Sequence, residues 1–406
     1  MFATPEHFFV TPFIKISRRD PYGGYAQLRK VAPVYRMANG TFIVTGHAAA
    51  TAALKEVRLE RRPDIAKTRF TENDDAAVSA FARVTSTSML YSNPPEHGRR
   101  RGFMARAFQP RFIERLRDST REVAVRLFET AAKRKKTFDV IKELAEPLPV
   151  HVIAHLVGVP EEGWAQCVTW SSHLAPLTDL DLPPERFERA IAAGTEFGWY
   201  LAGLFEERRR APKDDILTQL IQARDRGEEL TDQELVSNVI TLFIGGHETT
   251  TNTLGHACVL FDRFPEARAA LMEDPTKLPG AVEELLRYEP AIHIVSQRAS
   301  EDLVLEGVTI PKDAAVWTSI GAANRDPARF PDPDHFDITR SPNPHLAFGS
   351  GAHMCIGAAL ARMELQVVLG TLFERYPDWR LVEKEFELRE TITFRGYQRL
   401  GFQLRG

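Results

Sequence analysis

The sequence has few cysteines and no pair of them in a metal-binding spacing. The cysteines of the 406-residue chain are Cys167, Cys258 and Cys355, and no Cys-x-x-Cys segment occurs. An odd number of distant cysteines argues against a disulfide framework and indicates a reducing compartment. Without a Cys-x-x-Cys pair, a structural zinc site has no support.

The sequence also lacks a long apolar run and a strong charge of either sign. The net charge is −3 and charged residues make up 26% of the chain, which gives no indication of a nucleic-acid partner. No run of about 18 uncharged apolar residues has the flanks of a membrane span. The apolar patch at residues 8–14 is too short for a signal peptide and has no basic segment before it. We therefore expect a cytosolic protein.

The order of the sequence patterns predicts a mainly α fold with small β-sheets. Residues 34–37 and 41–44 flank Ala38-Asn39-Gly40, which is the pattern of a β-hairpin. Up to about residue 65 the chain is partly β, from about 66 to 290 it is mainly helical, and from about 291 to 406 it is mixed. No stretch has the composition of a linker, and 43% of the residues are hydrophobic. We therefore expect one domain spanning residues 1–406.

One long helix is predicted in the middle of the chain. Thr231 and Glu234 stand at the spacing of a capping box, which marks a helix start. Residues 235–261 then contain a single formally charged residue, Glu248. A helix of about 30 residues that is apolar on most sides should pass through the protein interior. A membrane span is the alternative, and the polar residues around Glu248 disfavour it.

Further elements are predicted after this helix. Residues 279–288 and 357–376 are expected to be helices. The alternation along residues 303–318 predicts paired strands with Gly307 at a turn, and the tail at residues 381–404 is expected to form strands again.

Cys355 lies in a glycine-rich segment that favours a reactive thiolate. Gly349 and Gly351 precede it and permit backbone conformations that other residues resist. The segment ends where a helix is predicted to begin, and the N-terminus of a helix favours a thiolate over a thiol. A buried, inert cysteine is the alternative, and we adopt that interpretation for Cys167 and Cys258.

The middle of the long helix combines two glycines, an acid and two threonines at residues 245–250. Each glycine costs a helix roughly 1 kcal/mol relative to alanine, but it leaves room for a flat group to approach the backbone. A threonine hydroxyl can bond to the preceding turn, and an acid in an apolar stretch is costly unless it has a partner or a task. The segment therefore predicts a pocket for a small polar species, with proton delivery. A packing kink is the alternative.

These two segments together resemble the cytochrome P450 family. The pattern Phe-Gly-x-Gly-x-His-x-Cys-x-Gly at residues 348–357 is similar to its haem-binding signature, and Gly-Gly-His-Glu-Thr-Thr at residues 245–250 is similar to the motif of its oxygen-activating helix. The resemblance extends from about residue 20 to the end of the chain. It implies the cytochrome P450 fold and a haem b group (iron protoporphyrin IX), with Cys355 as the axial ligand of the iron.

The resemblance also assigns roles to other residues. It implies that Thr249 hydrogen-bonds the oxygen being activated and that Glu248 relays protons, so these two are the candidate catalytic residues. The predicted contacts of the haem are Cys355, His97, Arg101, Arg298, His345, His353, Phe348, Gly349 and Gly245.

Two further sets have structural and substrate-binding roles by the same resemblance. Glu284 and Arg287, one helical turn apart, would form with Arg340 a structural constellation behind the haem. The substrate pocket would be lined by Thr241, Ile244, Ile292, His293, Val295 and Phe394. His293 is hypothesised to anchor a polar group of the substrate, and a histidine satisfied within the core is the alternative.

The activity implied is insertion of one oxygen atom from O₂ into a small or medium hydrophobic molecule, such as a terpenoid, steroid, fatty acid or polyketide. No flavin or iron–sulfur motif occurs in the sequence, so electrons would pass from NAD(P)H through a ferredoxin reductase and a ferredoxin. The alternatives are a peroxide-driven haem-thiolate enzyme and a non-catalytic haem sensor or carrier. Glu248 and Thr249 count against both. We expect a monomer without a membrane anchor or a nucleic-acid partner.

Overall fold

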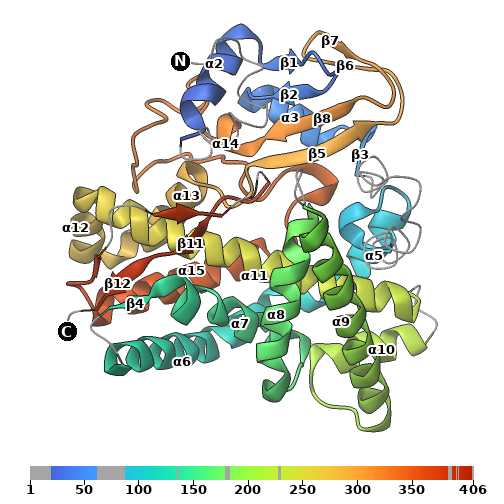
Figure 1. The fold of residues 1–406 in the computed structure, drawn as a ribbon, viewed down its shortest axis with the longest axis vertical. Helices are drawn as coiled ribbons and strands as arrows, with labels where there is room; N and C mark the ends of the chain where they lie inside the picture. Colours follow the sequence, from blue (N-terminus) through green and yellow to red (C-terminus); the bar gives the residue numbers. More distant parts are fainter. Residues whose placement is uncertain are drawn as a thin grey trace. The chain divides into compact units, whose positions relative to one another are not determined.

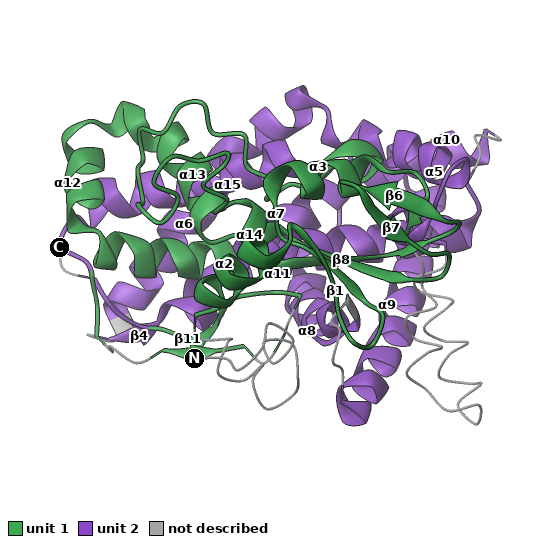
Figure 2. Ribbon diagram, turned by 90° about the horizontal axis from the view of Figure 1, so that it is seen from above, with its two compact units in different colours: residues 1–61, 252–355, 380–400 green, residues 62–251, 356–379, 401–406 purple. Residues whose placement is uncertain are grey.

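The computed structural model describes residues 20–61, 87–134, 137–178, 183–226, 230–382, 386–389, 391 and 393–404 (Figure 1). The apolar patch at residues 8–14 lies outside these residues. The chain divides into two compact units (Figure 2). Unit 1 comprises residues 1–61, 252–355 and 380–400, and unit 2 comprises residues 62–251, 356–379 and 401–406. That the whole chain is one domain stays a prediction.

Unit 1 contains a five-stranded sheet in the order β1-β2-β8-β5-β3. The strands are β1 (Val34–Arg36), β2 (Phe42–Val44), β3 (Leu59–Glu60), β5 (Ile294–Ala299) and β8 (Ala315–Ser319). The predicted hairpin is confirmed, because Val34 pairs with Val44 in an antiparallel register. β2 and β8 run parallel, although the other neighbouring pairs are antiparallel.

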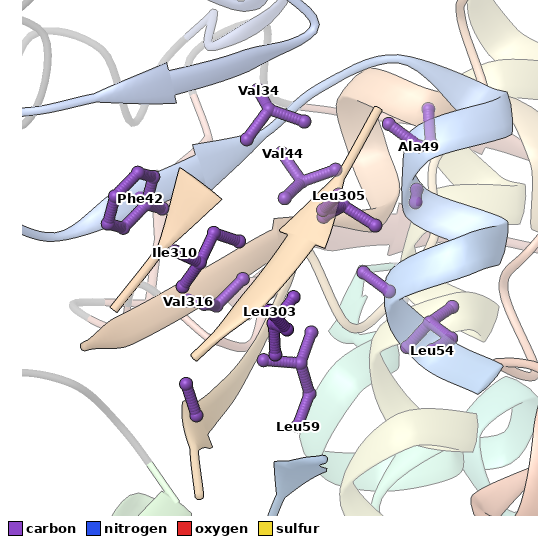
Figure 3. Close-up of a cluster of buried hydrophobic side chains, with 14 of the residues drawn as sticks. Val34, Phe42, Val44, Ala49, Leu54, Leu59, Leu303, Leu305, Ile310 and Val316 are labelled. Atoms are coloured by element: carbon purple, nitrogen blue, oxygen red, sulfur yellow. The ribbon is translucent and has the colours of Figure 1, made fainter. Parts of the chain in front are cut away.

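An apolar core joins this sheet to helix α3 (His47–Lys55) and to the strand pair β6 (Leu303–Leu305) and β7 (Val308–Ile310) (Figure 3). Phe42, Val44 and Val316 come from the sheet, and Ala49 comes from α3. Each of these side chains is almost fully buried. Burial of an aliphatic or aromatic side chain stabilises a fold by about 1.5–3 kcal/mol, so unit 1 has a firm core of its own.

The remaining elements of unit 1 are mostly helical. They are α2 (Tyr22–Val31), α12 (Pro265–Glu273), η8 (Pro275–Lys277), α13 (Leu278–Tyr288), α14 (Ile320–Ala323), η9 (Gly351–His353), β9 (Arg380–Leu381), β10 (Glu387–Leu388) and β11 (Tyr397–Arg399). The predicted helix at 279–288 and the paired strands within 303–318 are confirmed. Gly307 makes the turn between β6 and β7 with φ +79°, a conformation that favours glycine. Helices α2 and α3 were not predicted.

Unit 2 is mainly helical. Its elements are η3 (Met89–Tyr91), α5 (Glu96–Met104), η4 (Ala105–Phe108), α6 (Pro110–Arg134), β4 (Phe138–Asp139), η5 (Ile141–Ala145), α7 (Pro147–Val157), η6 (Glu161–Gly163), α8 (Trp164–Leu174), η7 (Ala175–Thr178), α9 (Pro184–Arg210), α10 (Ile216–Asp225), α15 (Ala358–Arg375) and β12 (Gly401–Gln403). β4 and β12 pair antiparallel. The helix predicted at 357–376 is confirmed as α15, and the strands predicted in the tail are present.

The predicted long helix is α11 (Asp232–Arg263), and the boundary between the two units falls within it, after Thr251. The capping box is confirmed. The backbone N–H of Thr231 donates to Glu234 Oε2 (2.9 Å), and the backbone N–H of Glu234 donates to Thr231 Oγ1 (3.2 Å). Among the described residues, no helix combines the length and the apolar character that crossing a membrane requires.

Candidate active site

The cysteine loop of unit 1 is folded by its own backbone. The N–H of Cys355 donates to the carbonyl of Phe348 (2.8 Å), and the N–H of Gly349 donates to the carbonyl of Leu346 (2.8 Å). Gly351 has φ +72°, and a Cβ added there would lie 2.7 Å from the carbonyl oxygen of Leu54. Only glycine allows this close approach of the loop to α3. The loop therefore has a defined shape that presents Cys355.

The three cysteines have different surroundings. The thiol of Cys355 is exposed, but Cys167 and Cys258 are buried. Burial raises the pKa of both buried thiols to about 12, so they remain protonated and inert at neutral pH. Cys355 is therefore the cysteine whose thiol is accessible to a ligand, and its role as the axial ligand stays a prediction.

Unit 1 also contains a buried ion-pair cluster. Arg287 donates from Nε and Nη2 to the carboxylate of Glu284 (both 2.7 Å), and Arg340 Nε lies 3.2 Å from Glu284 Oε2. Arg287 Nη1 also donates to the carbonyl of Asn324 (2.9 Å). The side-chain oxygen of Asn324 in turn accepts the N–H of Leu346 (2.7 Å) at the start of the loop. The cluster is thus linked by hydrogen bonds to the segment that carries Cys355.

In unit 2, one face of α11 is left open by the protein. Thr241, Gly245 and Thr249 are spaced one helical turn apart and so share a face, and all three are partly or fully exposed although most of α11 is buried. Thr249 Oγ1 donates to the carbonyl of Gly245 (2.6 Å). Glu248, the next residue to Thr249, is only 4% exposed. A buried acid therefore adjoins a hydroxyl on an accessible helix face.

Sequence reasoning missed the contact between α5 and the start of α11. Arg99 and Arg100 both bind Glu234, the capping-box acid, and Arg100 Nε donates to its Oε1 at 2.8 Å. Burial alone would raise the pKa of Glu234, but Arg99, the Thr231 N–H and Arg100 together lower it to about 2. Two adjacent arginines were a visible signal, but no local pattern identified an acid so far along the chain as their partner.

Comparison with protein families matches residues 170–390 of the chain to cytochrome P450. The biotin biosynthesis cytochrome P450 of Bacillus subtilis is 36% identical over 388 residues, which cover 94% of this chain and 95% of that protein. The mycinamicin IV hydroxylase/epoxidase of Micromonospora griseorubida is 36% identical over 393 residues, which cover 95% and 96%. This chain belongs to the cytochrome P450 family.

Solved cytochrome P450 structures share its fold. P450BioI in complex with hexadec-9Z-enoic acid ligated acyl carrier protein matches with a TM-score of 0.89 and 35% identity, covering 96% of this chain and 100% of that one. The myxobacterial cytochrome P450 CYP267B1 in complex with myristic acid matches with a TM-score of 0.88 and 33% identity over the whole of both chains. The predicted P450 fold is confirmed, and the protein is a P450 monooxygenase, an oxidoreductase.

The family implies a haem held by a cysteine thiolate, and residues of both units fit such a group. In unit 1 the exposed Cys355 ends a loop of fixed shape, and a thiolate is a suitable donor for haem iron. In unit 2 a Cβ built at Gly245 would have no neighbour within 4 Å, so the open face of α11 can accept a flat ligand. Cys355 and the open face of α11, each taken by itself, are thus compatible with a bound haem, and the haem contacts remain predictions.

The other predicted haem contacts are distributed over both units. His97 and Arg101 are on α5 of unit 2, and His97 is buried. In unit 1, Arg298 Nη1 donates to the carbonyl of Asp313 (2.7 Å), and His345 Nε2 lies 3.1 Å from Glu283 Oε2. His353 is in η9. Arg298 and His345 thus have partners within the protein, and the propionate contacts of all these residues stay predictions.

The predicted pocket residues of unit 1 lie on paired segments. Ile292 forms an antiparallel bridge with Phe394, and the N–H of His293 donates to the carbonyl of Thr393 (2.8 Å). Val295 belongs to β5. The two predicted pocket segments, at residues 292–295 and at Phe394, are therefore side by side although about 100 residues separate them in the sequence. Thr241 and Ile244 are on α11 in unit 2, where Thr241 Oγ1 lies 2.7 Å from Ser88 Oγ.

His293 is buried in a charged cluster. Its Nδ1 lies 3.3 Å from the Tyr25 hydroxyl, and its Nε2 lies 3.3 Å from Glu289 Oε1. Arg395 Nε donates to the same carboxylate oxygen of Glu289 at 2.6 Å. Burial lowers the pKa of His293 despite the nearby carboxylate of Glu289. His293 is thus enclosed by core residues, but its Nε2 has no hydrogen bond of its own, so neither the core interpretation nor the substrate-anchoring role is decided and both stay predictions.

Proposed function

We propose that this P450 binds haem b and inserts one oxygen atom from O₂ into a long acyl or polyketide chain, by hydroxylation or epoxidation. When bound, the haem supplies the reductive activation of O₂, so that one oxygen atom enters the substrate and the other leaves as water. The observation that carries the proposal is the pair Glu248 and Thr249 on α11. The acid is 4% exposed, and the hydroxyl lies on the open face of the helix.

The two side chains divide the handling of protons between them. Thr249 donates its own proton to the Gly245 carbonyl, so its oxygen can accept a hydrogen bond from a water molecule or another proton donor on the open face. Glu248 can hold a proton and pass it to such a water, which is the role of a general acid. A peroxide-driven enzyme has less need of this pair, because its oxidant already carries two protons.

The proposed substrate class is supported by the names of the relatives and by the apolar side chains predicted for the pocket. The relatives include a protein named as a polyketide biosynthesis P450 and one named as 6-deoxyerythronolide B hydroxylase. P450BioI has been solved with a fatty acid on its acyl carrier protein. The predicted pocket residues Ile292, Val295 and Phe394 of unit 1 are apolar, as is Ile244 of unit 2. Such side chains suit a hydrocarbon chain. We therefore favour acyl and polyketide chains over terpenoids and steroids.

The electron donor is proposed to be an acidic ferredoxin that is reduced by a ferredoxin reductase with NAD(P)H. Arg106 on η4 and Arg111 and Arg115 on α6 are exposed. Arginines gathered on a surface speed and orient the binding of a partner of opposite charge. Reversing the charge of Arg111 and Arg115 to Glu should slow electron transfer from a ferredoxin and weaken its dependence on ionic strength. A monomeric state and a cytosolic location stay predictions.

An optical binding screen tests the substrate class. Displacement of the iron-bound water should shift the Soret band when myristic acid, hexadec-9Z-enoic acid on an acyl carrier protein, or 6-deoxyerythronolide B is added. Testosterone and camphor serve as the steroid and terpenoid comparisons. A shift with acyl or macrolide probes at lower concentration than with the comparisons supports the proposal, and the reverse order contradicts it.

Turnover assays then test how O₂ is used. The wild type should oxidise the probe that binds best with ferredoxin, ferredoxin reductase and NADPH, and do so faster than with hydrogen peroxide. Glu248→Gln and Thr249→Ala should each lower the O₂-dependent rate by about 10²–10⁴-fold, the range for loss of general acid catalysis. Equal rates with peroxide and with the ferredoxin system, unaffected by both substitutions, would favour the peroxide-driven alternative.

A further inference from the structure

The turn of α11 that carries Glu248 and Thr249 is held by polar contacts with other elements of unit 2. His247, Thr250 and Thr251, which flank the pair, make these contacts. His247 Nδ1 lies 3.0 Å from Ser171 Oγ, Thr250 Oγ1 donates to Glu364 Oε2 (3.1 Å), and Thr251 Oγ1 donates to the Ala145 carbonyl (2.9 Å). The partners come from α8, α15 and η5. His247, Thr250 and Thr251, to which the P450 resemblance assigns no catalytic role, thus hold this turn of the helix in place.

The contact between Ser171 and His247 links α11 to α8 and is buried. Ser171 is fully buried and His247 is 1% exposed. The Ser171 hydroxyl donates its hydrogen to the Val168 carbonyl on its own helix (3.2 Å). The Ser171 oxygen can therefore accept a hydrogen bond from His247 when the imidazole carries its hydrogen on Nδ1. A buried polar contact of this kind is costly to break, because each partner loses a hydrogen bond that water cannot replace.

Aromatic contacts join the same helices at neighbouring positions. Trp170, next to Ser171, stacks on Phe197 of α9 with centroids 5.0 Å apart, and Phe197 meets Phe243 of α11 edge-on at 5.2 Å. Phe243 precedes His247 by one helical turn. Ring contacts thus pack α8, α9 and α11 together one helical turn before His247. A shift of α8 would act on His247 and, through one peptide unit, on Glu248.

We propose that the Ser171–His247 hydrogen bond is a positioning contact, through which α8 fixes the placement of Glu248 and so the timing of proton delivery. This proposal rests on the monooxygenase function proposed above. His247 acts through Glu248 and is a positioning residue. When the acid is misplaced, protons arrive out of step with electrons, and more of the O₂ leaves as hydrogen peroxide (O₂ + NADPH + H⁺ → H₂O₂ + NADP⁺) and less oxygen reaches the substrate.

Four variants of the full-length haem-loaded protein test the contact. Ser171→Ala and His247→Phe remove it. Ser171→Thr keeps the hydroxyl, and His247→Asn keeps an N–H donor near the position of Nδ1. The matched control is Thr169→Ala on the same helix, because the Thr169 hydroxyl is exposed and bonds only within α8, to the Ala165 carbonyl at 3.2 Å.

The first readout is hydrogen exchange of the peptide covering residues 243–251, measured by mass spectrometry without turnover. Ser171→Ala and His247→Phe should speed exchange roughly threefold to tenfold, the factor that one ordinary buried hydrogen bond represents. Thr169→Ala should leave exchange unchanged, and at least one of the two conservative variants should restore the wild-type rate. Unchanged exchange in both removing variants overturns the proposal.

The second readout is the share of NADPH electrons recovered as hydrogen peroxide with myristic acid as the probe. The removing variants should raise this share severalfold at unchanged probe affinity, and the restoring variants should return it towards the wild-type value. Faster exchange with an unchanged peroxide share would make the contact merely structural and overturn the proposal. If the wild type oxidises none of the probes, the proposed function fails instead, and the positioning contact is then decided by hydrogen exchange alone.

Discussion

Arg287 and Glu284 form a two-pronged ion pair in which both hydrogen bonds are 2.7 Å long and neither side chain is exposed. Asn343 Nδ2 donates to the same carboxylate (3.1 Å). Removing two charges from water is expensive, and such a pair persists because its geometry satisfies almost every donor and acceptor. Through Asn324, the pair also supports the start of the loop that carries Cys355.

Arg287→Lys should therefore destabilise the protein severely. Lysine supplies a single point charge and cannot reproduce the planar fork, so part of the Glu284 carboxylate would be left unpaired inside the core. We expect a loss of about 3–5 kcal/mol in the free energy of unfolding, measured by urea denaturation. The control is Arg117→Lys, because Arg117 pairs with Glu114 at the same spacing on the surface. That variant should lose less than about 0.5 kcal/mol, and equal losses would contradict the account.

Gly351→Ala should lower haem incorporation. The new Cβ would lie 2.7 Å from the Leu54 carbonyl, and φ of +72° is unfavourable for alanine. Relief of the clash must move the loop away from α3 and displace Cys355. Haem content per chain, measured by absorbance after reconstitution, should fall several-fold. Gly40→Ala is the control, since Gly40 has φ +84° but no neighbour within 4 Å of its Cβ. A normal haem content in Gly351→Ala would show that the close approach is dispensable.

Glu364→Gln should change the pH dependence of stability. Burial raises the pKa of Glu364 to about 8, although the hydrogen bond with Thr250 acts in the opposite direction. Below about pH 8 the folded protein thus keeps this carboxyl protonated. In the unfolded chain the same carboxyl ionises above its ordinary pKa of 4.5. Glu364 therefore lowers the free energy of unfolding progressively as pH rises from about 4.5 to about 8.

The glutamine variant has no proton to lose, so it should gain stability relative to the wild type over that pH range. The gain at pH 8 should reach up to about 4 kcal/mol and should vanish near pH 4. Urea unfolding at a series of pH values measures it. Glu374→Gln on the same helix is the control, because Glu374 is exposed and pairs with Arg121 at the surface. A pH-independent difference between wild type and Glu364→Gln would contradict the buried, protonated carboxyl.

The parts of the fold that sequence reasoning predicted are those that depend on neighbours in the chain. The hairpin turn after Ala38, the capping box at Thr231 and the motif around Glu248 are all local patterns. Helices α2 and α3 were missed, because short helices in a region with strand-like pieces give weak periodicity. Local sequence patterns therefore predicted most of the longer elements and the segments that carry Cys355, Glu248 and Thr249.

The contacts that hold the candidate site in place were beyond reach of such patterns. Glu364 lies in a predicted helix but belongs to no motif, and its link to Thr250 joins residues far apart in the sequence. The link between His247 and Ser171 is likewise distant, and neither residue belongs to a motif that names the other. Tertiary packing selects these partners, and a single sequence carries no record of that selection.

The most direct test of the whole account is the absorption spectrum of the reduced carbon monoxide complex. A thiolate from Cys355 on the iron predicts the long-wavelength Soret band of sulfur-ligated haem in the wild type. Cys355→Ala should lose this band, and Cys258→Ala should keep it because the Cys258 thiol is buried. A wild-type complex without the long-wavelength band, or a Cys355→Ala protein that retains it, would contradict the account.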